Sequence, residues 1–169
     1  MTESTATAEA GSLAGLAGKY LTFKLGAEEY GLEILKVQEI IKMMEITRVP
    51  RMPDFIRGVI NLRGKVIPVV ELRMKFGMEP LPTTDKTCIV VVQVAHGKGR
   101  ITMGTIVDEV SEVLDVGAEQ IEAAPEFGAS VNTEFILGMG KVAKKVVMLL
   151  DVDRVLSVSE IGALGAIKG

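Results

Sequence analysis

The chain has 169 residues, a formal net charge of −3 and a pI near 5.3, which is the size of one domain or of two very small ones. Nucleic-acid-binding surfaces are usually basic, so this charge argues against DNA or RNA as a partner. Cys88 and His96 are the single cysteine and the single histidine, which excludes an internal disulfide and leaves too few ligands for a zinc site. We expect no metal and no other cofactor.

The two ends of the chain differ in composition from its middle. Residues 1–18 are small and polar without a sustained apolar period, which predicts a disordered leader. Residues 158–169 are predicted to form a loose tail. No apolar run reaches the length of a membrane-spanning helix, and the start lacks the features of a signal peptide. We therefore expect a cytoplasmic protein with no direct membrane insertion.

Alternating and β-branched segments predict that the middle of the chain is mainly β-structure. Residues 20–25 alternate apolar and polar side chains, which is the period of a half-buried strand. Two hairpins are predicted further along, one at 87–107 with its turn at 96–99 and one at 140–152. These segments indicate an all-β fold.

Two shorter segments could contain helix. Residues 34–43 fit two structures, because their apolar positions lie on one helical face while their β-branched content favours a strand. A short helix is predicted at 151–157, where Asp151 can act as the N-cap.

The sequence also repeats itself in two blocks that keep their order along the chain. One block recurs at a separation of 80 residues and the other at a separation of 73, and both matches share glycine, acidic and aliphatic positions. The matches are "FIRGV" (55–59) with "FILGM" (135–139), "KVIPVVEL" (65–72) with "KVVMLLDV" (145–152), and "GLEILKVQEI" (31–40) with "GTIVDEVSEV" (104–113).

The simplest explanation of this repeat is two copies of one small β unit. Each copy has room for about five strands, which suits a small closed barrel with few exposed edges. We place the first barrel at residues 19–82 and the second at residues 83–157.

No set of residues in the sequence predicts catalysis. Gly58, Gly64 and Lys65 resemble a phosphate-binding loop, but five residues separate the glycines where the motif has four, and Val66 follows the lysine. Cys88 lies in an apolar strand, where an inert thiol is the usual state. Paired carboxylates among Glu39, Glu109 and Glu112 remain open as an alternative.

Residues 61–64, "NLRG", interrupt an otherwise apolar segment and predict a turn between two strands. Gly64 can adopt the positive φ that such turns often need. Arg63 has two interpretations: it is either a solvated turn charge or an arginine that faces a partner or an ion-pair mate. Glu39, in the preceding element, is the mate we predict.

Four segments together resemble the CheW family of bacterial chemotaxis coupling proteins. The resemblance covers about residues 18–157, and its motifs occur in family order: "EEYGLEILKVQEI", "ITRVPRMPDFIRGVINLRGKVIPVVELRMKFG", "VDEVSEVLDVGAEQIEAAPEF" and "LLDVDRVL". The family fold is two SH3-like five-stranded β-barrels packed together, with short helices. This implied fold agrees with the internal repeat.

The resemblance also implies a non-enzymatic adaptor that couples the histidine kinase CheA to chemoreceptors in signalling arrays. Its partners would be the regulatory domain of CheA and the cytoplasmic tip of methyl-accepting chemoreceptors. By position, the implied receptor-binding residues are Val37, Glu39, Asn61, Arg63 and Gly64, and the implied kinase-binding residues are Ile46 and Thr47.

Some alternatives stay open at this point. Met43 and Met44 could pack in the core or in a partner interface. Two other classes of protein compete with the adaptor interpretation. One is a relative of the same fold, such as the coupling module of CheV or the regulatory domain of the kinase. The other is a small hydrolase or transferase on a β-barrel.

Overall fold

The computed structural model describes residues 15–79, 82–96, 99–122, 136–142 and 144–154. Within these residues the chain forms eleven strands, one short α-helix and two 3₁₀ turns. In chain order the elements are β1 (Gly18–Leu25), β2 (Glu28–Glu33), η1 (Ile34–Lys36), β3 (Val37–Lys42), β4 (Ile56–Leu62), β5 (Lys65–Glu71), α2 (Leu72–Lys75), β6 (Cys88–His96), β7 (Gly99–Val107), β8 (Glu109–Val116), η2 (Ala118–Gln120), β9 (Ile121–Glu122), β10 (Ile136–Val142) and β11 (Lys145–Leu150).

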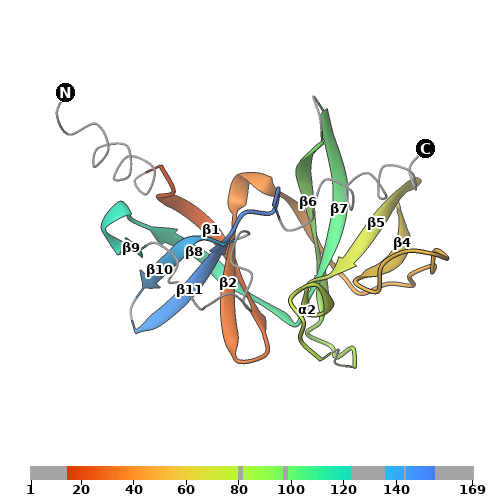
Figure 1. Cartoon of the computed structure of the whole chain (residues 1–169), viewed down its shortest axis with the longest axis horizontal. Coiled ribbons are helices and arrows are strands. Elements are labelled where there is room, and N and C mark those ends of the chain that lie inside the picture. The colour runs from red at the N-terminus through yellow and green to blue at the C-terminus, as the bar shows by residue number, and fades with distance from the viewer. Residues whose placement is uncertain (1–14, 80–81, 97–98, 123–135, 143, 155–169) are drawn as a thin grey trace.

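The strands form two sheets, which Figure 1 shows as two lobes. Barrel 1 has the strand order β3-β6-β7-β5-β4, and barrel 2 has the order β8-β1-β2-β11-β10-β9, in which β9 is only two residues long. The predicted all-β fold of two packed SH3-like barrels with short helices is confirmed.

The barrels do not correspond to two successive halves of the chain, so the predicted boundary between residues 82 and 83 is corrected. The β1–β2 hairpin comes from the first copy of the repeat but lies in barrel 2, while the β6–β7 hairpin comes from the second copy and lies in barrel 1. The two copies have exchanged their first hairpins. Because the hairpins are equivalent, the exchange preserves the pairing of each barrel while it links the two barrels covalently at two crossings.

The strand registers show how closely the two barrels repeat each other. In β4–β5, Leu62 pairs with Lys65, and the register shifts between Ile56 and Gly58. In β10–β11, the residues 80 positions later pair in the same way, with the same irregularity between Ile136 and Gly138. The repeat predicted from the sequence is therefore a repeat of the structure, down to its β-bulge.

Apolar residues on opposite faces of the same strands contribute to different cores. In β6, Ile89 and Val91 pack inside barrel 1, whereas Val90 and Val92 join a large cluster that also contains Phe23 of β1. That shared cluster lies between the barrels, and barrel 2 has its own core. A strand that is buried on both faces needs a continuous apolar run, which explains the "IVVV" of β6.

The two ambiguous segments are also resolved where they are described. Residues 34–43 form the 3₁₀ turn η1 and then strand β3, so the strand interpretation applies to most of the segment. His96 of β6 pairs with Gly99 of β7 on either side of the predicted turn at 96–99, whose residues 97 and 98 lie outside the described residues. Residues 151–154 form a turn, and the rest of the helix predicted at 151–157 lies outside the described residues, as do most of the predicted leader and the tail.

One crossing between the barrels is held by the carboxylate of Asp108, which lies between β7 and β8. Arg73 of α2 donates to both oxygens, from Nε at 2.8 Å and from Nη2 at 2.6 Å, and the backbone N–H of Gly26 donates to Oδ2 at 2.8 Å. Arg73 is 7% exposed. Burial alone would raise the pKa of Asp108, but these hydrogen bonds outweigh it and hold the pKa below its usual value.

The other crossing is held in the same manner by Asp153, in the turn after β11. Lys36 of η1 donates from Nζ to Oδ2 at 2.8 Å, and the backbone N–H of Ala95 donates to Oδ1 at 2.9 Å. Burial alone would raise the pKa of Asp153, but the hydrogen bonds from Lys36 and Ala95 outweigh this effect, so the pKa is lowered. Asp153 occupies the position of Arg73 in the other copy, 80 residues later. At this pair of positions a basic residue in one copy is thus replaced by an acidic one in the other, and its partner Lys36 lies one residue beyond Leu35, the counterpart of Asp108.

We expect Asp108→Asn to lower the free energy of unfolding by about 2–4 kcal/mol, because it leaves a buried guanidinium without its counter-charge. Asp115→Asn is the matched control, since Asp115 pairs with Lys19 at 3.4 Å on the open surface. The control should change stability by less than about 1 kcal/mol. Urea unfolding followed by circular dichroism measures both, and equal effects would contradict a structural role for the joint.

The two lowered carboxyl pKa values also predict a loss of stability in acid. Unfolded Asp titrates near pH 3.9, and the folded groups titrate below it, so the unfolded chain takes up protons first as the pH falls. The contribution of the two joints should be complete above about pH 5 and should decline as the pH drops below about 4. When the pH is lowered from about 5 to below about 4, the double variant Asp108→Asn/Asp153→Asn should lose less stability than the unmodified protein. If the double variant lost as much stability in acid as the unmodified protein, that loss would have to come from other carboxylates.

Candidate partner-binding face

The predicted turn at 61–64 is a two-residue hairpin turn made by Arg63 and Gly64. Their φ angles are 52° and 87°, and the Asn61 Oδ1 atom accepts a hydrogen bond from the Gly64 N–H at 2.8 Å. Positive φ at both central residues is typical of a type I′ turn, whose twist suits a β-hairpin. The sequence predicts the positive φ of Gly64 but not that of Arg63, because arginine rarely adopts this conformation.

Arg63 forms a bidentate ion pair with Glu39, the mate predicted from the sequence. Its Nη1 and Nη2 atoms donate to Oε2 and Oε1 of Glu39, each at 2.6 Å. The hydrogen bond from Arg63 holds the pKa of Glu39 below its usual value. The Arg63 side chain is 71% exposed. A charge pair this accessible can be approached by a partner without prior unfolding of the barrel.

The ion pair crosses the seam of barrel 1. Glu39 belongs to β3 at one edge of the sheet, and Arg63 follows β4 at the other edge. Val37 lies two residues before Glu39 and is half-buried against the shared core. The structure therefore brings Glu39 together with the turn residues Asn61, Arg63 and Gly64, whereas Val37 of the same strand packs towards the shared core.

Ile46 and Thr47, the predicted kinase-binding residues, lie further along the same seam. Thr47 exchanges two backbone hydrogen bonds of 2.8 Å with Val59 of β4, and its side chain is exposed. A Cβ at Gly58 would overlap the Thr47 carbonyl oxygen, so glycine is needed for this close approach. Ile46 is half-buried against the core of barrel 1.

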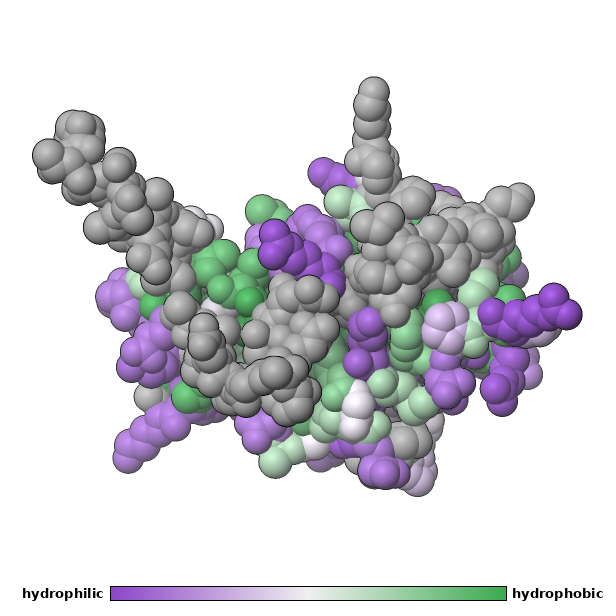
Figure 2. Space-filling model, in the orientation of Figure 1, coloured by the Kyte–Doolittle hydropathy of each residue, from purple (hydrophilic) through white to green (hydrophobic). Residues whose placement is uncertain are grey.

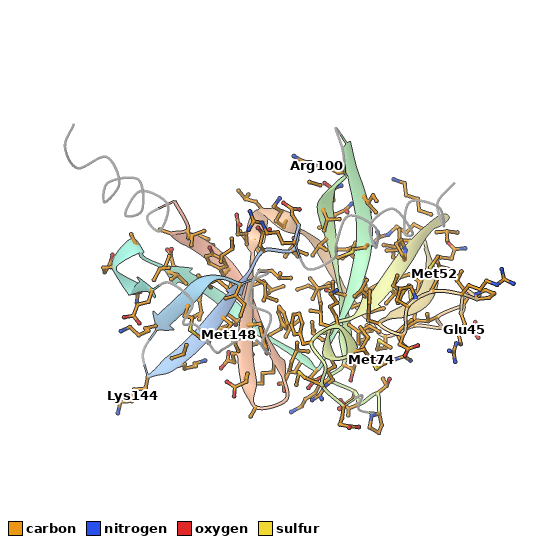
Figure 3. The ribbon with its side chains drawn as sticks, in the orientation of Figure 1. Glu45, Met52, Met74, Arg100, Lys144 and Met148 are labelled. Atoms are coloured by element: carbon orange, nitrogen blue, oxygen red, sulfur yellow. The ribbon has the colours of Figure 1, made fainter. Side chains whose placement is uncertain are left out.

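The methionines before this segment divide between core and surface. Met43 packs against the core of barrel 1, whereas Met44 is 39% exposed. In Figure 3 the labelled Glu45 and Met52 lie at the outer end of barrel 1, far from Lys144 at the tip of the β10–β11 hairpin. The loop between β3 and β4 thus forms one end of the molecule.

Barrel 2 has an ion cluster at the equivalent seam, which sequence reasoning missed. Lys145 of β11 contacts Glu29 at 3.1 Å and Glu112 at 3.5 Å. Glu112 is the counterpart of Glu39, 73 residues later. The alignment of the two copies could have indicated this cluster, because it places Glu112 at the position of Glu39.

Exposed aliphatic side chains also occur at equivalent positions of the two barrels. Ile40 and Val66 of barrel 1 are 44% and 49% exposed, and their counterparts Val113 and Val146 of barrel 2 are 50% and 49% exposed. On the face drawn in Figure 2, apolar residues reach the surface in separate places among hydrophilic ones. Such exposed aliphatics beside charges are suited to protein contacts.

The described residues offer little for catalysis. No group of three or more His, Cys, Asp or Glu among them could hold a metal ion. Burial raises the pKa of the half-buried Cys88 thiol. The three candidate carboxylates each lie near a cation: Glu39 near Arg63, Glu112 near Lys145, and Glu109 near Lys86 at 3.9 Å. In the described part of the chain, no helix has the length and hydropathy of a membrane span.

Comparisons with known proteins agree on one family. The family model described as "CheW-like domain" matches residues 19–160. The Chemotaxis protein CheW of Klebsiella aerogenes is 42% identical over 142 residues, which are 84% of this chain and 83% of that protein. The Probable chemotaxis protein CheW of Rhizobium etli is 33% identical over 140 residues, or 83% of this chain and 88% of that protein. The crystal structure of the scaffolding protein TtCheW from Thermoanaerobacter tengcongensis matches with a TM-score of 0.74 and 34% identity, and the match covers 86% of this chain and 91% of that one.

Two linked SH3-like barrels with a charged, accessible seam define a scaffolding protein whose surface serves protein contacts. The chain belongs to the CheW family. It is a scaffold, or adaptor, of bacterial chemotaxis and not an enzyme.

Proposed function

We propose that this adaptor couples the histidine kinase CheA to the cytoplasmic tips of chemoreceptors. The observation that carries the proposal is the bidentate Glu39–Arg63 pair on the seam of barrel 1, at positions that match the receptor-facing residues of the family. An exposed charge pair between two sheet edges gives a receptor helix a fixed and directional contact.

The receptor-binding surface would consist of the seam of barrel 1. Its members share one edge of β3 or the β4–β5 turn, and they are Val37, Glu39, Asn61, Arg63 and Gly64. Val37 supplies apolar contact area, the ion pair supplies charge, and the Asn61 side chain fixes the turn that positions Arg63. Binding there would recruit the protein to receptor arrays at the membrane.

The kinase would bind the segment around Ile46 and Thr47. This segment follows β3 and pairs with β4, so its backbone is fixed while the Thr47 side chain stays exposed. A rigid backbone lowers the entropy cost of binding a second barrel. Because the receptor and kinase surfaces both use β3 and β4, one rigid barrel would transmit the position of one partner to the other.

We expect Arg63→Ala to weaken binding to a chemoreceptor tip fragment by about tenfold or more, since it removes both hydrogen bonds of the pair and leaves Glu39 unpaired. The control is Arg51→Ala, because Arg51 is also an exposed arginine with a positive φ, 65°. Co-sedimentation with the receptor fragment measures binding, and far-UV circular dichroism checks the fold. Unchanged receptor binding by a folded Arg63→Ala protein would contradict the proposed role.

We expect Thr47→Arg to weaken binding to the CheA regulatory domain by more than about tenfold, because a partner-less charge would have to be desolvated there. Receptor binding should stay unchanged. Thr83→Arg is the matched control, since Thr83 is an exposed threonine in the segment between α2 and β6. Pull-down with each partner separately distinguishes the two surfaces. Loss of both interactions, or of neither, would count against separate sites.

A further inference from the structure

The two barrels differ at one pair of equivalent lysines. Lys145, the first residue of β11, contacts the carboxylates of Glu29 and Glu112. Lys65, the first residue of β5, is its counterpart in barrel 1. The position of Glu29 is occupied there by Thr102, as the parallel pairings show: Gly104 faces Val69 in barrel 1, and Gly31 faces Leu149 in barrel 2.

Lys65 consequently lacks the partners that its counterpart has. Among the residues that the structure describes, no carboxylate lies within 4.0 Å of the Lys65 ammonium. Glu39, the counterpart of Glu112, is already engaged by both terminal nitrogens of Arg63. The lysine at the seam of barrel 1 therefore retains an uncompensated positive charge, whereas the equivalent lysine of barrel 2 is paired with two glutamates.

Two adjoining shallow hollows surround this lysine, with volumes of about 210 and 250 Å³. Both are lined by Lys65, Ile67 and Thr102, one also reaches Glu39 and Arg63, and the other includes Val66. Pairing of β5 with β7 begins only at Val69, so the start of β5 is left open beside β7. We call the surface formed by Lys65, Val66, Ile67 and Thr102 the Lys65 hollow.

We propose that the Lys65 hollow binds a helix of the chemoreceptor tip that presents a carboxylate and, one helical turn away, an aliphatic side chain. The carboxylate pairs with Lys65, and the aliphatic side chain packs on Val66, which is 49% exposed. This inference rests on the proposed receptor-binding function and extends its surface from the Glu39–Arg63 pair along β5. The uncompensated charge beside exposed apolar surface determines the chemistry of the partner.

Barrel 2 supplies the design of the test. Thr102→Glu transfers the Glu29 position of barrel 2 into barrel 1, so that Lys65 gains an internal partner and is no longer available. The fold should tolerate this change, because the same pair already exists at the equivalent place. Lys65→Glu reverses the charge of the hollow. Lys144→Glu is the matched control: it makes the same charge change at the exposed tip of the β10–β11 hairpin (Figure 3).

The measurement is the Kd for a soluble chemoreceptor tip fragment, determined by titration calorimetry at low and at moderate salt. We expect about three- to tenfold weaker binding for Thr102→Glu and at least about tenfold for Lys65→Glu, with no change for Lys144→Glu. Both losses should shrink as salt screens the charges. Melting followed by circular dichroism should show Thr102→Glu to be at least as stable as the unmodified protein.

A charge exchange identifies the pairing directly. Single Glu→Lys changes along the receptor tip should include one that binds the Lys65→Glu protein more tightly than it binds the unmodified protein. Normal receptor binding by folded Thr102→Glu and Lys65→Glu proteins would overturn the Lys65 hollow, as would an equal loss for Lys144→Glu. The proposed function fails separately, if the unmodified protein itself does not bind the receptor fragment.

Discussion

Two carboxylates at the crossings, Asp108 and Asp153, fix how the barrels sit against each other. Each accepts a backbone N–H from a hairpin and a charged hydrogen bond from the segment beside a crossing. The shared apolar cluster supplies most of the attraction between the barrels, but it is not directional. The two joints add direction, because charge-assisted hydrogen bonds tolerate little displacement. Both joints lie beside the places where the chain crosses from one barrel to the other.

The candidate partner-binding face lies at the seam between the two edge strands of barrel 1. Strand β3 enters barrel 1 from a crossing and pairs with β6, and the segment that follows β3 reaches β4 through the isolated Thr47–Val59 pairing. Glu39 and Arg63 bridge that seam. A seam closed by an exposed ion pair and one pair of backbone hydrogen bonds is rigid enough to position side chains and open enough to contact a helix.

Much of this structure could be predicted from the sequence because local patterns carry it. Period-two alternation predicts the strands, and Gly64 predicts the turn. The internal repeat predicts the duplicated unit, which extends to the equivalent registers of β4–β5 and β10–β11. The boundary between the barrels could not be predicted in this way. Self-similarity shows which strands are equivalent, but equivalent hairpins satisfy either barrel, so the exchange leaves no local signal. The positive φ of Arg63 and the joint at Asp108 likewise depend on contacts between segments distant in sequence.

Duplication also shows which charges the architecture itself requires. Each crossing carries one ion pair, Arg73 with Asp108 and Asp153 with Lys36, and the charges at positions 73 and 153 have opposite signs. At the seams the copies differ in a more consequential way. Barrel 2 surrounds Lys145 with two glutamates, whereas barrel 1 pairs Glu39 with Arg63 and leaves Lys65 beside Thr102. Because barrel 2 is closed by the equivalent strands with its lysine paired, closure of the barrel does not account for the open charge of barrel 1, which stays available to the acidic helix that we propose as its partner.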